Sequence, residues 1–165
     1  GSLSGLLDKY ILVHQTGGAM EFRDFEKLSL LKGSLGAEKS RNYIISKFFE
    51  PMETESIMVQ ADLVVSRAGM NTVAELAVLK KPSLLIPIPV SSNNEQFKNA
   101  LFLKKLGLGE VEEQKNLNPE SFLITINHMF KNIDKYKLHK PLEAFNYDAA
   151  KKIVDVIYAS AKNNN

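Results

Sequence analysis

The feature that most constrains this chain is a regular alternation between short runs of β-branched or aromatic residues and longer segments with helical spacing. Such an alternation is typical of βαβ units, in which each helix carries the chain back so that successive strands lie parallel. We therefore predict an α/β fold, a Rossmann-like open parallel sheet flanked by helices. The runs 10–16, 42–49, 61–66, 83–88 and 107–111 are predicted as strands, and 22–31, 53–60, 72–79, 94–106, 119–130 and 147–159 as helices.

Several of these elements carry more detailed expectations. The strand 61–66 is short and rich in apolar residues, so we expect both of its faces to be buried. The helix 119–130 has a good N-cap in Asn118 and a proline, Pro119, at its first position. Apolar side chains at helical spacing in 94–106 and 147–159 are expected to face the core. They are Phe97, Leu101, Phe102, Ile153, Val156 and Ile157.

Length and composition fit one globular domain, which we assign to residues 3–161 of the 165. Residues 1–2 are interpreted as the remnant of an expression tag and 162–165 as a disordered tail. A net charge of +2, with no basic stripe, gives no indication of a nucleic-acid partner. The chain has no cysteine, which excludes disulfides and thiolate zinc sites, and its three histidines lack metal-site spacing. No apolar run approaches the roughly 20 residues of a membrane helix.

The segments that follow the predicted strands are where chemistry is expected, because open α/β sheets bind ligands beyond the carboxyl ends of their strands. In the segment 61–75, Gly69 permits close approach of a ligand to the backbone, and a helix begins near Thr72. The amides and the dipole of that helix's first turn favour a phosphate, and Arg67 adds a cation. The spacing alone is a weak signal, because strand–glycine–helix turns are common in α/β proteins.

Glu75 has two interpretations. Thr72 and Glu75 have the spacing of a capping box, in which the threonine hydroxyl and the glutamate carboxylate each accept a backbone amide hydrogen. In the alternative, the carboxylate accepts hydrogen bonds from a vicinal diol such as that of ribose. Local pattern favours the capping box, and a diol next to a diphosphate favours the second interpretation.

The segment 87–100 is the second polar region. Ser91, Ser92 or Asn93 would suffice as the N-cap of the helix that follows. The amide and carboxylate groups outnumber what a helix start needs, which indicates a site for sugar hydroxyl groups.

Four motifs together resemble the C-terminal domain of the MurG family of GT-B glycosyltransferases. They are "HQTG" at 14–17, "ADLVVSRAGMNTVAELA" at 61–77, "P.LLIPIP" at 82–89 and "NNEQFKNALFLKKLGLGEV" at 93–111. Their order and separations are similar to those of the family, which makes the set far more specific than any single motif. The resemblance implies the C-terminal half of a two-domain GT-B enzyme, in which this domain holds a UDP-sugar donor.

The resemblance also implies roles for individual residues. The carboxylate of Glu75 would bind the ribose hydroxyls, and the backbone at Phe49 would contact the uracil edge. Arg67 would support its loop. The diphosphate would meet Gly69, Met70, Asn71 and Thr72, and the sugar would meet Gln96 and Asn99 with Glu95 close by.

The resemblance implies inverting glycosyl transfer by the full-length enzyme, in which UDP-N-acetylglucosamine would donate its sugar to a lipid-linked acceptor in cell-wall synthesis. The enzyme would work in the cytoplasm, peripheral to the inner face of the cell membrane. The UDP-sugar is a substrate, and neither a cofactor nor an essential active-site metal is expected. The general base would lie in the N-terminal acceptor domain, which this sequence lacks, so we assign no catalytic residue here and expect the chain alone to be inactive.

Some positions depart from the family. The family has a glutamine pair where this chain has Glu95 and Gln96, which leaves the donor sugar open. The domain of the family also begins with a strand and a glycine-rich loop that this sequence does not contain. Two alternatives therefore remain: another glycolipid or dolichol-pathway N-acetylglucosaminyltransferase subunit, and a non-catalytic nucleotide-binding or scaffold module. The oligomeric state is not predicted.

Overall fold

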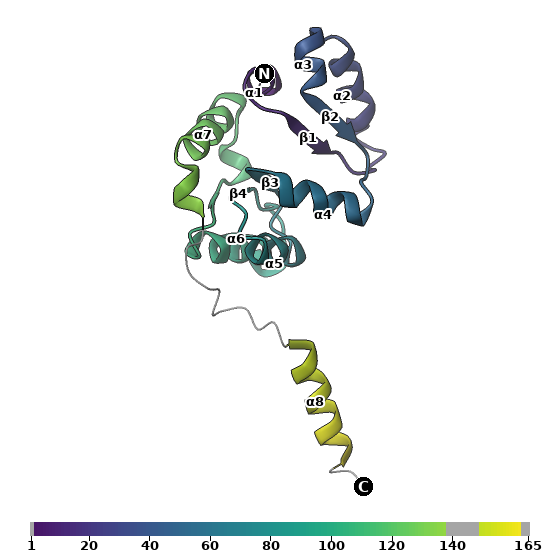
Figure 1. Cartoon of the computed structure of the whole chain (residues 1–165), viewed down its shortest axis with the longest axis vertical. Helices are drawn as coiled ribbons and strands as arrows, with labels where there is room; N and C mark the ends of the chain where they lie inside the picture. Colours follow the sequence, from purple (N-terminus) through teal and green to yellow (C-terminus); the bar gives the residue numbers. More distant parts are fainter. Residues whose placement is uncertain (1, 138–148, 163–165) are drawn as a thin grey trace.

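The computed structural model describes residues 2–137 and 149–162, and these form eight α-helices, five short strands and three 3-10 turns (Figure 1). The α/β class predicted from the sequence is confirmed. The strands are β1 (Leu12–Gln15), β2 (Tyr43–Ser46), β3 (Val64–Ser66), β4 (Ser83–Leu85) and β5 (Gly109–Val111). The helices are α1 (Ser2–Leu7), α2 (Asp24–Gly33), α3 (Ala37–Arg41), α4 (Pro51–Gln60), α5 (Met70–Val78), α6 (Glu95–Lys105), α7 (Pro119–Lys131) and α8 (Ala149–Lys162).

The strands form two parallel sheets and not the single sheet that the alternation predicts. β1 pairs with β2, and β4 lies between β3 and β5. Within the described residues no ladder joins the two sheets, and Figure 1 shows them as separate ribbons. The helices α1 and α3 were not predicted, because each is too short to show a helical period.

Burial differs sharply among these strands. Leu84 and Leu85 of the central strand β4 are almost completely buried, because helices cover both faces and strands cover both edges. In β3, Val65 is 41% exposed, so the expectation that this strand is buried on both faces is wrong. The physical reason is position, since among the described residues β3 is an edge strand that pairs only with β4.

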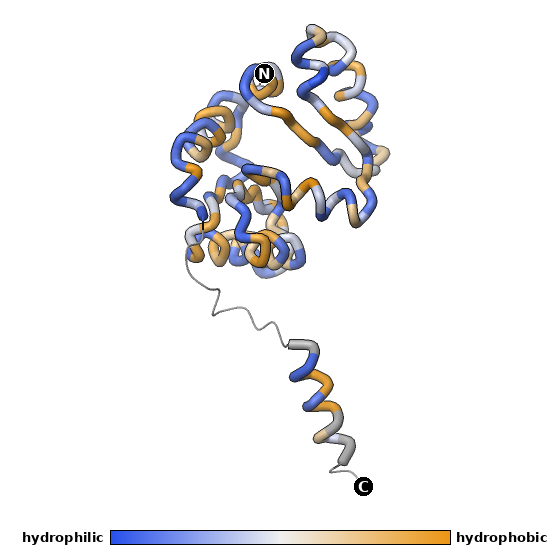
Figure 2. The backbone as a smooth tube through the Cα atoms, in the orientation of Figure 1, coloured by the Kyte–Doolittle hydropathy of each residue, from blue (hydrophilic) through white to orange (hydrophobic). Residues whose placement is uncertain are grey.

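Two apolar clusters form the core, one on each face of β4. The first joins Leu85 to α5 and α6 through buried residues such as Leu76 and Leu103. The second joins Leu84 to α1 and α7 through Leu6 and Met129. Orange segments in Figure 2 mark these apolar stretches on the strands and on the helices beside them.

The second cluster also connects the two sheets. The ring of Tyr10, just before β1, stacks on Phe130 of α7 with a centroid distance of 4.2 Å. Lys9 and Tyr10 both donate hydrogen bonds to the Asn127 side-chain oxygen, each at 3.1 Å. Helix α7 begins as predicted: the Asn118 side chain accepts from the amides of the first turn, and Pro119 follows it.

Two of the helices depart from the expected pattern of burial. In α6 the buried residues are Ala100 and Leu103, whereas Phe97 and Leu101 are exposed and Phe102 is half-buried. The apolar positions are present, but the helix is rotated so that Ala100 and Leu103 pack into the cluster shared with α5. In α8 the expected burial is wrong throughout: Ile153, Val156 and Ile157 are 61–65% exposed. No helix in the described part of the chain is long and apolar enough to cross a membrane.

Candidate functional site

The turn between β3 and α5 has the geometry of an anion site. Gly69 is the N-cap in an extended conformation, and the first intrahelical bond runs from the Val73 amide to the Gly69 carbonyl at 2.9 Å. The amides of Met70, Asn71 and Thr72 have no acceptor among the described residues, because a helix leaves its first amides unpaired. Nothing lies within 4 Å of the position that a Cβ on Gly69 would take, so the turn is open on that side.

The capping box expected at Thr72 and Glu75 is not formed. Helix α5 begins at Met70, two residues before the expected start, so Thr72 is inside the first turn and is not the N-cap. The Glu75 side chain is exposed and has no hydrogen-bond or ion-pair partner in the described part of the chain. Its carboxylate is therefore available to a ligand.

Two long-range hydrogen bonds hold the turn in place. The Arg67 guanidinium donates to the Ile86 carbonyl at 3.1 Å, which ties the turn to the end of β4. From the other side, the Asn99 side-chain amide donates to the carbonyl of the fully buried Ala68, also at 3.1 Å. Arg67 thus ties its loop to the end of β4, and the side-chain oxygen of Asn99 has no hydrogen-bond partner among the described residues.

The segment after β4 places further polar groups beside this turn. The Gln96 side-chain oxygen accepts from the Ile88 amide at 3.1 Å, which leaves its NH2 group unpaired among the described residues. Asn93 and Asn94 both take left-handed backbone conformations, with φ of 51° and 54°. The N-cap of α6 is Asn94, which makes no side-chain cap of its own, but the Ser91 hydroxyl oxygen accepts from the Gln96 amide in the first turn at 3.4 Å.

The predicted site residues fall into two groups. Hydrogen bonds and neighbouring helices bring together the β3–α5 turn and the start of α6, with Glu95 exposed next to Gln96. Phe49 belongs to the other sheet, in the segment after β2, and α4 connects it to β3. The first group comprises Arg67, Gly69, Met70, Asn71, Thr72, Glu75, Glu95, Gln96 and Asn99.

Two residues near Phe49 were not predicted. The Gln15 side-chain oxygen accepts from the Phe49 amide at 3.2 Å. The ring of Phe48 is 65% exposed and lies against Gly18, where an added Cβ would be 3.0 Å from the ring. Both lie one residue before the end of a predicted strand, 10–16 or 42–49, and no local sequence pattern distinguishes them from their neighbours.

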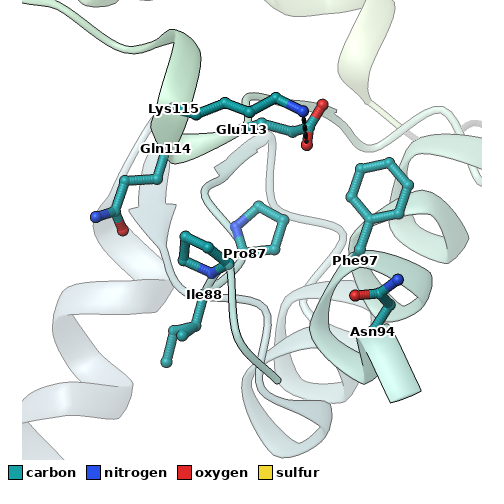
Figure 3. Close-up of a pocket in the computed structure, with 8 residues that line it drawn as sticks. Pro87, Ile88, Asn94, Phe97, Glu113, Gln114 and Lys115 are labelled. Atoms are coloured by element: carbon teal, nitrogen blue, oxygen red, sulfur yellow. Dashed lines mark ion pairs between the residues drawn. The ribbon is translucent and has the colours of Figure 1, made fainter. Parts of the chain in front are cut away.

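The described residues also line a hollow of 190 Å³ beside the start of α6 (Figure 3). Pro87 and Phe97 face it from opposite sides, and an ion pair between Glu113 and Lys115, 3.0 Å long, lies at its rim. None of the residues expected to bind the diphosphate or the ribose lines this hollow. It is therefore a neighbour of the first group and not its centre.

His14 has a structural environment. Its Nδ1 atom lies 2.9 Å from the hydroxyl of the fully buried Tyr43, across the β1–β2 pair. Burial lowers the pKa of His14 below its ordinary value, although the charge of Asp24 opposes the shift. The contact supports a role in organising the end of β1.

The parallel strands, the flanking helices and the open helix N-terminus after β3 define a Rossmann-like α/β domain. The chain belongs to the family described as the glycosyltransferase family 28 C-terminal domain, whose model matches residues 4–155. A crystal structure of MurG from Acinetobacter baumannii is similar to the structure of this chain, with a TM-score of 0.68 and 24% sequence identity. The similarity covers 89% of this chain and 42% of that one. The structure of the glycotransferase of kitacinnamycin is similar with a TM-score of 0.57 and 17% sequence identity, over 81% of this chain and 31% of that one.

Curated relatives are similar in sequence. A UDP-N-acetylglucosamine–N-acetylmuramyl-(pentapeptide) pyrophosphoryl-undecaprenol N-acetylglucosamine transferase of Prochlorococcus marinus (strain AS9601) is 38% identical over 78% of this chain and 32% of its own length. The transferase of that name from Clostridium novyi (strain NT) is 32% identical over 94% of this chain and 39% of its own. The chain thus spans less than half the length of these relatives.

Proposed function

We propose that this chain is the UDP-sugar-binding part of an inverting N-acetylglucosaminyltransferase that acts on a lipid-linked acceptor in cell-wall synthesis. The observation that carries the proposal is the turn after β3, where three helix amides stand one turn before the carboxylate of Glu75. Neither the amides nor the carboxylate has a partner in the described part of the chain. The names of the relatives supply the donor, UDP-N-acetylglucosamine, and the class of acceptor.

The amides of Met70, Asn71 and Thr72 bind the diphosphate in this proposal. Oriented amides and the positive end of the helix dipole stabilise the charge that grows on UDP as it leaves, without any rearrangement of the protein. Gly69 keeps the approach open, and Arg67 supports the turn from behind. The proposal assigns no residue to a metal ion.

Glu75 binds the ribose and the start of α6 binds the sugar. A carboxylate beside a diphosphate is unfavourable unless it faces hydroxyl groups, and a ribose diol offers two donors to its two oxygens. Hydrogen bonds to the protein fix the side chains of Gln96 and Asn99. The Gln96 NH2 group then donates to a sugar hydroxyl, and the Asn99 side-chain oxygen accepts from one. Glu95 lies next to them.

Catalysis itself needs more than this chain. No residue of the first group is placed as a base for the acceptor hydroxyl, and the relatives are more than twice as long as the matched region. The base and the acceptor site are therefore assigned to a further domain, and the chain alone binds donor without transferring sugar. In the whole enzyme the site works at the cytoplasmic face of the membrane, where a lipid-linked acceptor is reached.

Isothermal titration of the chain with UDP, UDP-N-acetylglucosamine and UDP-glucose tests the proposal. Glu75→Ala should weaken UDP binding about 10- to 100-fold, because two hydrogen bonds to a charged acceptor are lost. Glu55→Ala, at an exposed glutamate of α4, is the matched control and should bind as the unmodified chain does. A folded chain that binds none of the three ligands would refute the proposal.

A further inference from the structure

The end of β1 and the segment after β2 form one hydrogen-bonded unit. Beyond the β1–β2 ladder, the Thr16 amide donates to the Ser46 carbonyl and the Gly17 amide to the Lys47 carbonyl, each at 3.0 Å. Gln15 closes the unit through its side chain, whose oxygen accepts from the Phe49 amide at 3.2 Å. The side chain of Gln15 is exposed although it makes this bond.

This bond fixes which way the Gln15 amide faces. A backbone N–H can only donate, so the atom opposite Phe49 must be the Gln15 oxygen and not its nitrogen. The NH2 group then points away from Phe49. It has no hydrogen-bond partner among the described residues, so two donors remain available at the surface.

The backbone groups beside Gln15 are occupied. The Phe48 carbonyl accepts from the Ser46 hydroxyl at 2.7 Å, and the Glu50 amide donates to the Glu53 carboxylate at 2.9 Å. The backbone at Phe49 is assigned to the uracil edge by the family pattern, and its amide already donates to Gln15. The exposed ring of Phe48 stands beside this set and offers an apolar surface to a planar ligand.

We infer that Gln15 is a specificity-determining residue for the base: its NH2 group donates to the C4 carbonyl oxygen of uracil, and its own oxygen stays on the Phe49 amide. This role rests on the proposed function, because Gln15 would recognise the base of the same donor nucleotide. Uracil has a carbonyl at C4 where cytosine has an amino group, and two donors facing each other cannot bond. The site should therefore prefer UDP to CDP.

Gln15→Glu separates recognition of the base from support of the loop. A carboxylate still accepts from the Phe49 amide, but it offers no donor to the base. Its negative charge weakens UDP and CDP alike, so the ratio of the two dissociation constants reports the base contact alone. Gln60→Glu introduces the same charge at an exposed glutamine at the end of α4 and serves as the matched control.

Titration of the full chain and both variants with UDP and with CDP gives the ratio. The unmodified chain and Gln60→Glu should prefer UDP, and Gln15→Glu should reduce that preference about tenfold, the effect of one hydrogen bond to the base. Circular dichroism verifies that each variant is folded. If UDP binds but the ratio is the same in all three proteins, Gln15 only supports the loop and the inference is wrong. If the unmodified chain binds neither nucleotide, the proposed function fails first and the inference with it.

Discussion

At the scale of single residues, the most informative titratable group is His14, which is held against the Tyr43 hydroxyl. Burial lowers its pKa in the folded state below the ordinary 6.5. As the pH falls below about 6.5, the unfolded chain takes up a proton at this position before the folded chain does. The contribution of His14 is therefore fully present above pH 6.5 and is lost as the pH falls through the lower, folded pKa.

His14→Gln tests this dependence, because glutamine keeps a hydrogen-bonding group near Tyr43 but does not titrate. Urea unfolding between pH 7.5 and pH 5 should show a smaller loss of stability in the variant than in the unmodified chain. His128→Gln, at an exposed side chain of α7, is the control for loss of a histidine. An identical slope in the unmodified chain and His14→Gln would contradict the assigned environment.

Individual site residues could be predicted from the sequence only where their chemistry is local. The glycine and the small polar residues of the β3–α5 turn predict an anion site from the sequence alone, and the structure shows an open helix start there. Gln15 and the partners of Arg67 and Asn99 could not be identified, because their hydrogen bonds join residues 34, 19 and 31 positions apart. Such pairs depend on how the strands are arranged, which no local pattern records.

At the scale of elements, α5 and α6 end in the same way but with different residues. After α6, Gly107 has a φ of 76°, and the amides of Gly107 and Leu108 bond back to the last turn. After α5, Lys80 takes the same conformation, with a φ of 53°, and the amides of Lys80 and Lys81 bond back in the same pattern. This is the Schellman motif, in which glycine avoids the strain of a Cβ.

Lys80→Gly should therefore stabilise the chain by about 0.5–1 kcal/mol. A left-handed conformation costs a residue with a Cβ about 1–2 kcal/mol, and glycine avoids this cost. Part of the benefit is lost because glycine gives the unfolded chain more conformational entropy. The urea midpoint should rise without a change in slope. Gly107→Lys is the reciprocal change and should lower the midpoint. A midpoint that falls in Lys80→Gly would show that the lysine side chain contributes more than its backbone strain costs.

Helix boundaries show what local signals can and cannot decide. The start of α7 was predicted correctly because Asn118 and Pro119 act on their own helix. The start of α5 was predicted two residues late, because the local spacing of Thr72 and Glu75 satisfies a capping box. Long-range bonds from Arg67 and Asn99 fix the preceding turn instead, and the helix begins where that turn ends.

At the scale of the whole molecule, the sequence predicted the class of fold but not the pairing of its strands. Every predicted strand exists, and each observed ladder is parallel. The division into two sheets was not predictable, because short apolar runs carry no information about their neighbours. The exposed apolar face of α8 has the same origin: helical spacing predicts a face but not what covers it.

Because no ladder joins the two sheets in the described part of the chain, we predict that a small set of side-chain contacts holds them together. Tyr10, which precedes β1, stacks on Phe130 and bonds to Asn127, and both partners belong to the helix that packs on β4. Tyr10→Ala removes the stacked pair and part of the buried area, a loss of about 1.5 kcal/mol. Because about 1.4 kcal/mol is a factor of ten in an opening equilibrium, amide hydrogen exchange in β1 and β2 should accelerate about tenfold.

The same variant should leave exchange in β4 closer to that of the unmodified chain, since Leu84 and Leu85 keep their packing against α5, α6 and α7. Phe22→Ala, at a ring that is 56% exposed in the β1–β2 half, is the matched control and should change neither sheet. Equal acceleration in both sheets of Tyr10→Ala would mean that the chain unfolds as one unit despite its two ladders. Acceleration confined to β1 and β2 would establish that α7 carries the coupling between the sheets.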